Sequence, residues 1–157
     1  MKKIILTLVL VGITSGAQAE KFLGKYSANQ YNQDSTSAPY GKYNPNTVGG
    51  INSPDSQYGD AYSNESANNP DASNAPKLYD SKGNYRGRLS NDPYDPESIS
   101  NPTGAYGSDM QNMQPDDPDN PNNPYGNGMT IQGQGDSKDP GDAVEDYFGD
   151  GEDDGDE

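Results

Sequence analysis

Large apolar side chains are too scarce in this chain to form an ordinary hydrophobic core. After residue 19 only ten Leu, Ile, Val or Phe remain among 138 residues, or about 7%. Ordering one residue costs roughly 1.5 kcal/mol, and fully burying one large apolar side chain returns only about 1.5–3 kcal/mol. We therefore predict that the chain after residue 19 is mostly intrinsically disordered and of low complexity.

The first nineteen residues have the pattern of a secretory signal peptide. Lys2 and Lys3 precede an apolar run over residues 4–13, and Ala17-Gln18-Ala19 is a small-x-small cleavage site before Glu20. The alternative is a membrane anchor, which needs roughly 18 apolar residues or more. No other apolar run follows, so we expect no membrane span after cleavage and an export to the periplasm or the extracellular space.

The composition excludes several kinds of chemistry. The chain has no Cys, His or Trp, so it has no thiolate ligand, disulfide or imidazole base. Loss of Lys2 and Lys3 changes the net charge from −15 to −17, and such a chain repels nucleic acids and anionic lipids. We expect no enzyme activity and no cofactor. Basic protein surfaces or divalent cations are the expected partners.

A degenerate repeat runs through two segments, the Tyr/Asn/Ser-rich residues 20–76 and the Pro/Asn/Asp/Gly-rich residues 90–135. The pattern Tyr-x-x-acid-Ser-x-x-x-Pro recurs after 31 and then 32 residues, with its marked positions at Tyr31, Ser35, Pro39; Tyr62, Ser66, Pro70; and Tyr94, Ser98, Pro102. Such units favour turns and extended pieces, whereas a stacked solenoid would require recurring large apolar positions. The spaced tyrosines either bind carbohydrate or protein surfaces or reflect composition alone.

Residues 77–89 predict a short β-hairpin between the two repeat segments. Asp80-Ser-Lys-Gly83 has the chemistry of a type I turn that a glycine at positive φ closes, with Tyr79 and Tyr85 in the flanking strands. The stretch contains Lys77, Lys82, Arg86 and Arg88, half of the basic residues after residue 19. It either contacts an acidic partner or the acidic tail, or is a solvated turn.

Three stretches resemble a set of small exported bacterial proteins. Ser53-Pro-Asp-Ser56 and Asn123-Pro-Tyr-Gly126 match their repeated Ser-Pro-Asp-Ser-x-x-Asn-Pro-Tyr-Gly units, and Leu78 to Gly87 matches their central Leu-Tyr-Asp-x-x-Gly-x-Tyr-Arg-Gly hairpin. The resemblance covers residues 22 to about 128 and is lost in the acidic tail. It implies export and a repetitive chain, but no activity and no site residues.

Residues 136–157 form an acidic tail with two local patterns. Asp150, Glu152, Asp154 and Asp156 follow the start of an EF-hand loop, but the loop's twelfth position and both of its flanking helices are missing. We expect loose, weakly selective Ca²⁺ association there. Residues 140–148 predict a short helix with apolar residues on one side, too short to be stable alone. It either folds on a partner or stays solvated.

The sequence favours an exported, non-enzymatic structural or interaction protein of the cell envelope or extracellular matrix, which presents turn repeats rich in Tyr, Asn and Pro. The alternative is an acidic exported protein that binds divalent cations loosely through residues 136–157. The repeat supports the first function, and the tail supports the second.

Overall fold

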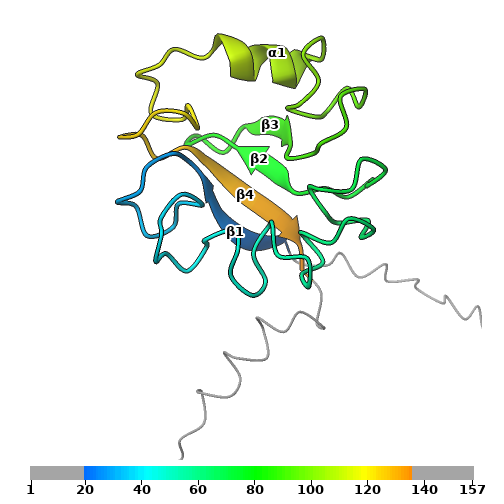
Figure 1. Cartoon of the computed structure of the whole chain (residues 1–157). Coiled ribbons are helices and arrows are strands. Elements are labelled where there is room, and N and C mark those ends of the chain that lie inside the picture. The colour runs from blue at the N-terminus through cyan, green and yellow to red at the C-terminus, as the bar shows by residue number, and fades with distance from the viewer. Residues whose placement is uncertain (1–19, 136–157) are drawn as a thin grey trace, which may run out of the picture.

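The computed structural model describes residues 20–135, which form a four-stranded sheet surrounded by turns (Figure 1). Its elements are β1 (Glu20–Tyr26), β2 (Lys77–Tyr79), β3 (Tyr85–Arg88), α1 (Ala105–Asn112) and β4 (Met129–Gln134). The sheet is antiparallel with the strand order β1-β4-β2-β3. Glu20 lies opposite Gln134, and Tyr26 lies opposite Met129. The two ends of the described chain are therefore paired strands.

The predicted hairpin is present. Lys77 lies opposite Arg88, and Tyr79 lies opposite Tyr85. The Gly83 N–H donates to the Asp80 carbonyl (3.0 Å), and Gly83 has a φ of +81°, as the turn chemistry predicted. β2 also pairs with the central strand β4. This pairing supplies the support that a lone hairpin lacks in water.

Overlapping β-turns replace regular secondary structure between the strands. Ser35 N–H donates to Asn32 O, Ala38 N–H to Ser35 O, and Gly41 N–H to Ala38 O, at 3.0–3.2 Å. The same three-residue step continues over residues 95–104 and 114–126. The first residue of most turns is Ser, Asn or Asp, and proline, which presets φ, often follows it. Local hydrogen bonds thus satisfy much of the backbone in these segments.

The interior combines a small apolar cluster with buried polar residues. The apolar cluster consists of Leu23, Ile51, Tyr58, Leu78, Met129 and Ile131. Beyond it, Ser35, Ser66 and Ser98 are fully buried. Within residues 20–135 no buried side-chain nitrogen or oxygen lacks a hydrogen-bond partner. Burial of these polar groups is tolerated because each one is paired.

The expectation of a mostly disordered chain is therefore wrong for residues 20–135. It counted only Leu, Ile, Val and Phe as core formers and left out Tyr58, Met129 and the small residues that the turns bury. It also gave every residue the same ordering cost. Proline restricts the unfolded chain, so a turn with proline as its second residue loses less entropy on folding. The helix expected over residues 140–148 lies outside the described residues, while α1 occupies Ala105–Asn112.

Two stretches 63 residues apart, 22–44 and 85–107, make equivalent contacts. Gly24 and Gly87 have φ values of +101° and +99°, and their Cα atoms face Tyr43 and Tyr106. Each tyrosine packs edge-on against an aromatic ring of the neighbouring edge strand, with centroids 5.0 Å apart for Phe22–Tyr43 and 5.2 Å for Tyr85–Tyr106. The absence of Cβ at the two glycines permits this close approach.

The same two stretches cover part of each edge of the sheet. Lys25 of β1 forms a parallel bridge with Ser35, and Arg88 of β3 forms one with Ser98. The Ser35 hydroxyl donates to the carbonyl oxygen of Ser27 (2.8 Å), and the Ser98 hydroxyl makes the equivalent bond eight residues back (2.9 Å). Edge strands with unpaired backbone groups invite aggregation, and these turns pair some of those groups within the chain.

Candidate interaction surfaces

Five tyrosines point away from the folded body. They are Tyr31, Tyr40, Tyr62, Tyr94 and Tyr125, which are 86–98% exposed. Four of them, all but Tyr40, follow one another at intervals of 31, 32 and 31 residues. The backbone N–H of each of these four donates to the side-chain oxygen of an Asn or Asp two residues earlier, at 2.8–3.0 Å. The same short turn thus carries each of the four rings.

The marked positions of the sequence repeat fall into two places. The serines Ser35, Ser66 and Ser98 lie inside the fold, and Pro39, Pro70 and Pro102 lie exposed outside, as do Tyr31, Tyr62 and Tyr94. The oxygen of each serine accepts the N–H two residues later at 3.0 Å. The serines therefore hold the turns, and the tyrosines are free to contact a partner.

Tyr125 was missed as a member of this set. It is not a marked position of the sequence repeat, because Gly128 and Met129 stand where the pattern after Tyr125 requires an acid and a Ser. The spacing of 31 residues from Tyr94 would have identified it. The shared local signal is an Asn or Asp two residues before each of the four regularly spaced tyrosines, since that residue supplies the turn's acceptor.

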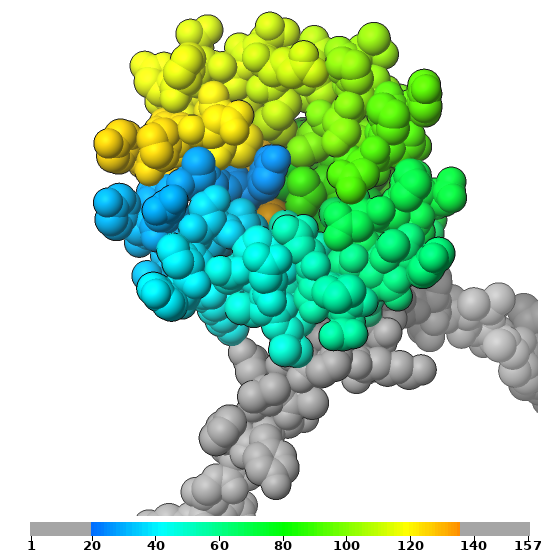
Figure 2. Space-filling view, in the orientation of Figure 1, coloured from blue at the N-terminus to red at the C-terminus, as the bar shows by residue number. Residues whose placement is uncertain are grey.

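A central hollow of about 320 Å³ is the second candidate surface. Figure 2 shows one face of the molecule, on which successive parts of the chain surround a centre where only a little of β4 is visible. The apolar residues lining the hollow are Tyr26, Pro45, Ile51, Ala67, Leu89 and Ile99, and its polar lining includes Thr36, Ser37, Asn52, Asn68, Asn91 and Ser100. None of its lining residues is Asp, Glu, Lys or Arg. Burial raises the pKa of the Tyr26 phenol, which stays neutral at ordinary pH.

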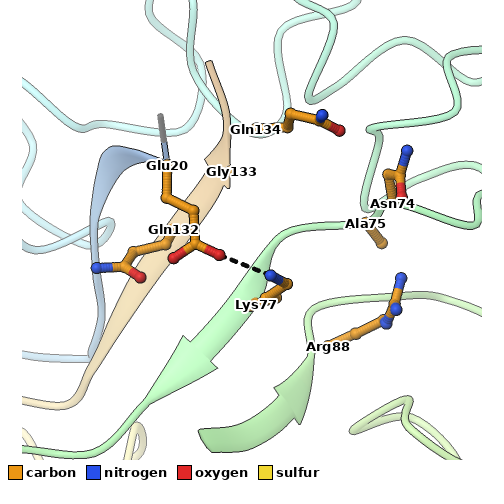
Figure 3. A pocket seen from close by; sticks show the side chains of 8 residues that line it. All are labelled: Glu20, Asn74, Ala75, Lys77, Arg88, Gln132, Gly133 and Gln134. Carbon is orange, nitrogen blue, oxygen red and sulfur yellow. Dashed lines mark hydrogen bonds and ion pairs between the residues drawn. The ribbon is translucent and has the colours of Figure 1, made fainter. Parts of the chain in front are cut away.

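A second cavity of about 250 Å³ lies where the ends of β1 and β4 meet the hairpin (Figure 3). Its charged residues are Glu20, Lys77 and Arg88. Lys77 Nζ lies 2.6 Å from Glu20 Oε1, and this hydrogen bond raises the pKa of Lys77. Arg88 Nε lies 2.9 Å from Glu97 Oε2. Two of the four basic residues of the hairpin thus already pair with carboxylates of the same fold.

Several predicted sites fall outside the described residues. These are the signal peptide over residues 1–19 with Ala17 and Ala19, the tail over 136–157, and the candidate metal ligands Asp150, Glu152, Asp154 and Asp156. In the part that the structure does describe, no group of three or more acidic side chains is placed to hold a metal ion. No helix between residues 20 and 135 has the length and apolarity to cross a membrane.

The geometry thus offers three surfaces: the outer tyrosines, the uncharged hollow and the charged cavity beside β1. The outer tyrosines and the residues that line the hollow carry no charge, so, unlike Lys77 and Arg88 of the charged cavity, they form no ion pair within the described residues. Comparisons of the chain with protein-family models, curated proteins and solved structures gave no match.

Proposed function

We propose that this chain is an exported, non-enzymatic interaction protein of the cell envelope or extracellular matrix, which contacts its partner surface through the exposed tyrosines. One observation carries the proposal. Tyr31, Tyr62, Tyr94 and Tyr125 are 86–92% exposed and lie on equivalent turns at nearly equal intervals.

Tyrosine is suited to such contacts because its ring has an apolar body and a polar tip. A tyrosine side chain also loses little conformational entropy when it is held at an interface. The turns that the Asn or Asp side chains close fix the backbone of each tyrosine residue before binding, which lowers the entropic cost of association. Weak contacts that several of these tyrosines make at the same time add through effective concentration, so a partner surface that repeats, such as an envelope or a matrix, suits this set of rings.

Export is part of the proposal and rests on the pattern of residues 1–19. Cleavage after Ala19 would leave every described residue of the sheet in the mature chain. N-terminal sequencing of the protein recovered from the periplasm or the medium should start at Glu20, and a full-length form confined to the cytoplasm would contradict export.

The tyrosine surface is tested by co-sedimentation of the purified mature protein with washed envelopes of the producing cell. Replacement of Tyr31, Tyr62, Tyr94 and Tyr125 by Ser should abolish sedimentation, and the single replacements should each weaken it. Tyr40→Ser is the matched control, because Tyr40 is equally exposed but lies outside the regular spacing. Unchanged sedimentation of the fourfold variant, with its circular dichroism spectrum retained, would refute the proposal.

The alternative function, loose cation binding, depends on residues 136–157. The same assay separates the two functions, since a chain without residues 136–157 keeps all four exposed tyrosines. Under the first function it sediments like the full mature chain. Loss of sedimentation on this deletion would favour the acidic tail as the functional part.

A further inference from the structure

We propose that the central hollow binds an uncharged sugar that carries an acetamido group. This proposal goes beyond the function above, because the hollow and the outer tyrosines are separate surfaces. The hollow measures about 320 Å³, which lies at the lower end of the range of small-molecule sites, about 300–1,000 Å³. Such sites combine apolar walls with a few polar groups that fix orientation, and this hollow has both.

The absence of charge in the lining selects a neutral ligand. All the lining residues are apolar or carry hydroxyl or amide groups. A charged ligand would lose its hydration in the hollow without gaining an opposite charge, which is costly. Each Asn side chain supplies two N–H donors and a carbonyl acceptor, and Ser and Thr supply hydroxyls. These groups match the hydroxyls and the amide of an acetamido sugar.

The apolar part of the lining explains the preference for the acetyl group. Ile51, Leu89 and Ile99 supply aliphatic surface, and Tyr26 supplies an aromatic ring. A methyl group buried there should strengthen binding about fourfold by the usual transfer value. The Asn91 Nδ2 to Asn68 Oδ1 hydrogen bond is long, at 3.4 Å, so these amides retain bonding capacity for the ligand amide.

The hollow is preformed, because the two equivalent stretches, 22–44 and 85–107, supply much of its lining. Tyr26, Thr36 and Ser37 of the first stretch correspond, 63 residues later, to Leu89, Ile99 and Ser100 of the second, and all six line the hollow. The Ser100 hydroxyl donates to the Ser90 carbonyl at 2.6 Å, and the Asn91 N–H donates to the Ala67 carbonyl at 3.1 Å. These bonds hold the walls in place, so little ordering is required on binding.

The test is an NMR titration of the ¹⁵N-labelled mature protein with N,N′-diacetylchitobiose, with N-acetylglucosamine and cellobiose in parallel. We expect saturable shifts of the backbone amides of Asn52, Asn91 and Ser100. Cellobiose, which lacks the acetamido groups, should bind about tenfold more weakly, as loss of a methyl contact and a hydrogen bond predicts. Binding of the disaccharide but not of the monosaccharide would assign the site to a glycan chain. Equal binding of the two would assign it to a free sugar.

Two variants locate the site. Ser37→Trp places a large side chain in the hollow, whereas Gln33→Trp places the same side chain at an exposed position nearby that does not line it. Ser37→Trp should abolish the shifts, and Gln33→Trp should retain them. Asn91→Asp, which adds a charge to the exposed rim with little change of shape, should weaken binding at least tenfold and serves if the tryptophan variant does not fold. The proposal is overturned if no sugar gives saturable shifts, if the shifts map to the outer tyrosines, or if Asn91→Asp binds like the wild type.

Discussion

Replacement of Gly24 by alanine tests the close contact that joins the first edge strand to its turns. Gly24 has a φ of +101°, and an added Cβ would lie 2.5 Å from the Tyr43 Cβ and 2.9 Å from the Asp34 carbonyl oxygen. The positive φ costs an L-residue about 1–2 kcal/mol. Overpacking against backbone and a ring stem adds about 1–3 kcal/mol. We therefore expect Gly24→Ala to lower the free energy of unfolding by about 2–5 kcal/mol, a large part of the usual 5–15 kcal/mol.

Gly83→Ala is the matched control, because Gly83 also has a positive φ, +81°, but no atom lies within 4 Å of its added Cβ. Gly83→Ala should cost only the conformational term of about 1–2 kcal/mol. Thermal unfolding followed by far-UV circular dichroism measures both, at roughly 4 °C per kcal/mol for a domain of this size. Equal losses in the two variants would refute the contact at Gly24. A wild-type chain without a cooperative transition would refute the fold itself.

Three further perturbations test other parts of the chain. Tyr58→Phe removes the hydroxyl that donates to the Gln134 carbonyl at 2.7 Å. Because Gln57 Nε2 also donates to this carbonyl, at 3.0 Å, urea unfolding should show a loss of only about 0.5–1.5 kcal/mol; unchanged stability would contradict the role of this bond. Burial is the main cause that raises the pKa of Tyr85 to about 12, and the negative charge of Glu97 adds to it. The stability that this raised pKa contributes is therefore complete below about pH 10 and is lost as the pH rises through the folded value. Tyr85→Phe should remove the step near pH 12 from the phenolate absorbance titration, and persistence of that step would show the assignment to be wrong. Isothermal titration of the mature protein should give at most millimolar Ca²⁺ association that disappears on deletion of residues 136–157, whereas a saturable micromolar heat would establish a defined site.

The local chemistry of the chain predicted its hairpin. Asp80 and Gly83 set the turn through hydrogen bonds between residues two to four positions apart, so the types of neighbouring residues suffice to specify it. The turn-forming character of the repeats follows from the same local rules, as at Asn101 with the Thr103 N–H. A count of large aliphatic residues could not show that these turns join into an ordered body. The energy of that body is spread over many paired polar groups and buried small residues.

The candidate surfaces were predicted less completely than the local structure. The spacing of Tyr31, Tyr62 and Tyr94 marked three of the outer tyrosines before their exposure was known. The hollow could not be inferred, since its lining comes from residues between positions 26 and 100 that only folding brings together. Uncharged Ser, Thr and Asn are common throughout this chain, so nothing in their local sequence distinguishes those that line a cavity.

The sequence by itself determined the turns, the hairpin and the intervals between the tyrosines, because each depends on residues a few positions apart or on simple spacing. The tertiary structure alone decided that Glu20 pairs with Gln134 and that Ser35, Ser66 and Ser98 lie inside. Closing a loop of more than a hundred residues costs conformational entropy that no single contact between its ends repays. The strand pairing, the small apolar cluster and the paired buried hydroxyls repay that cost only when they form together.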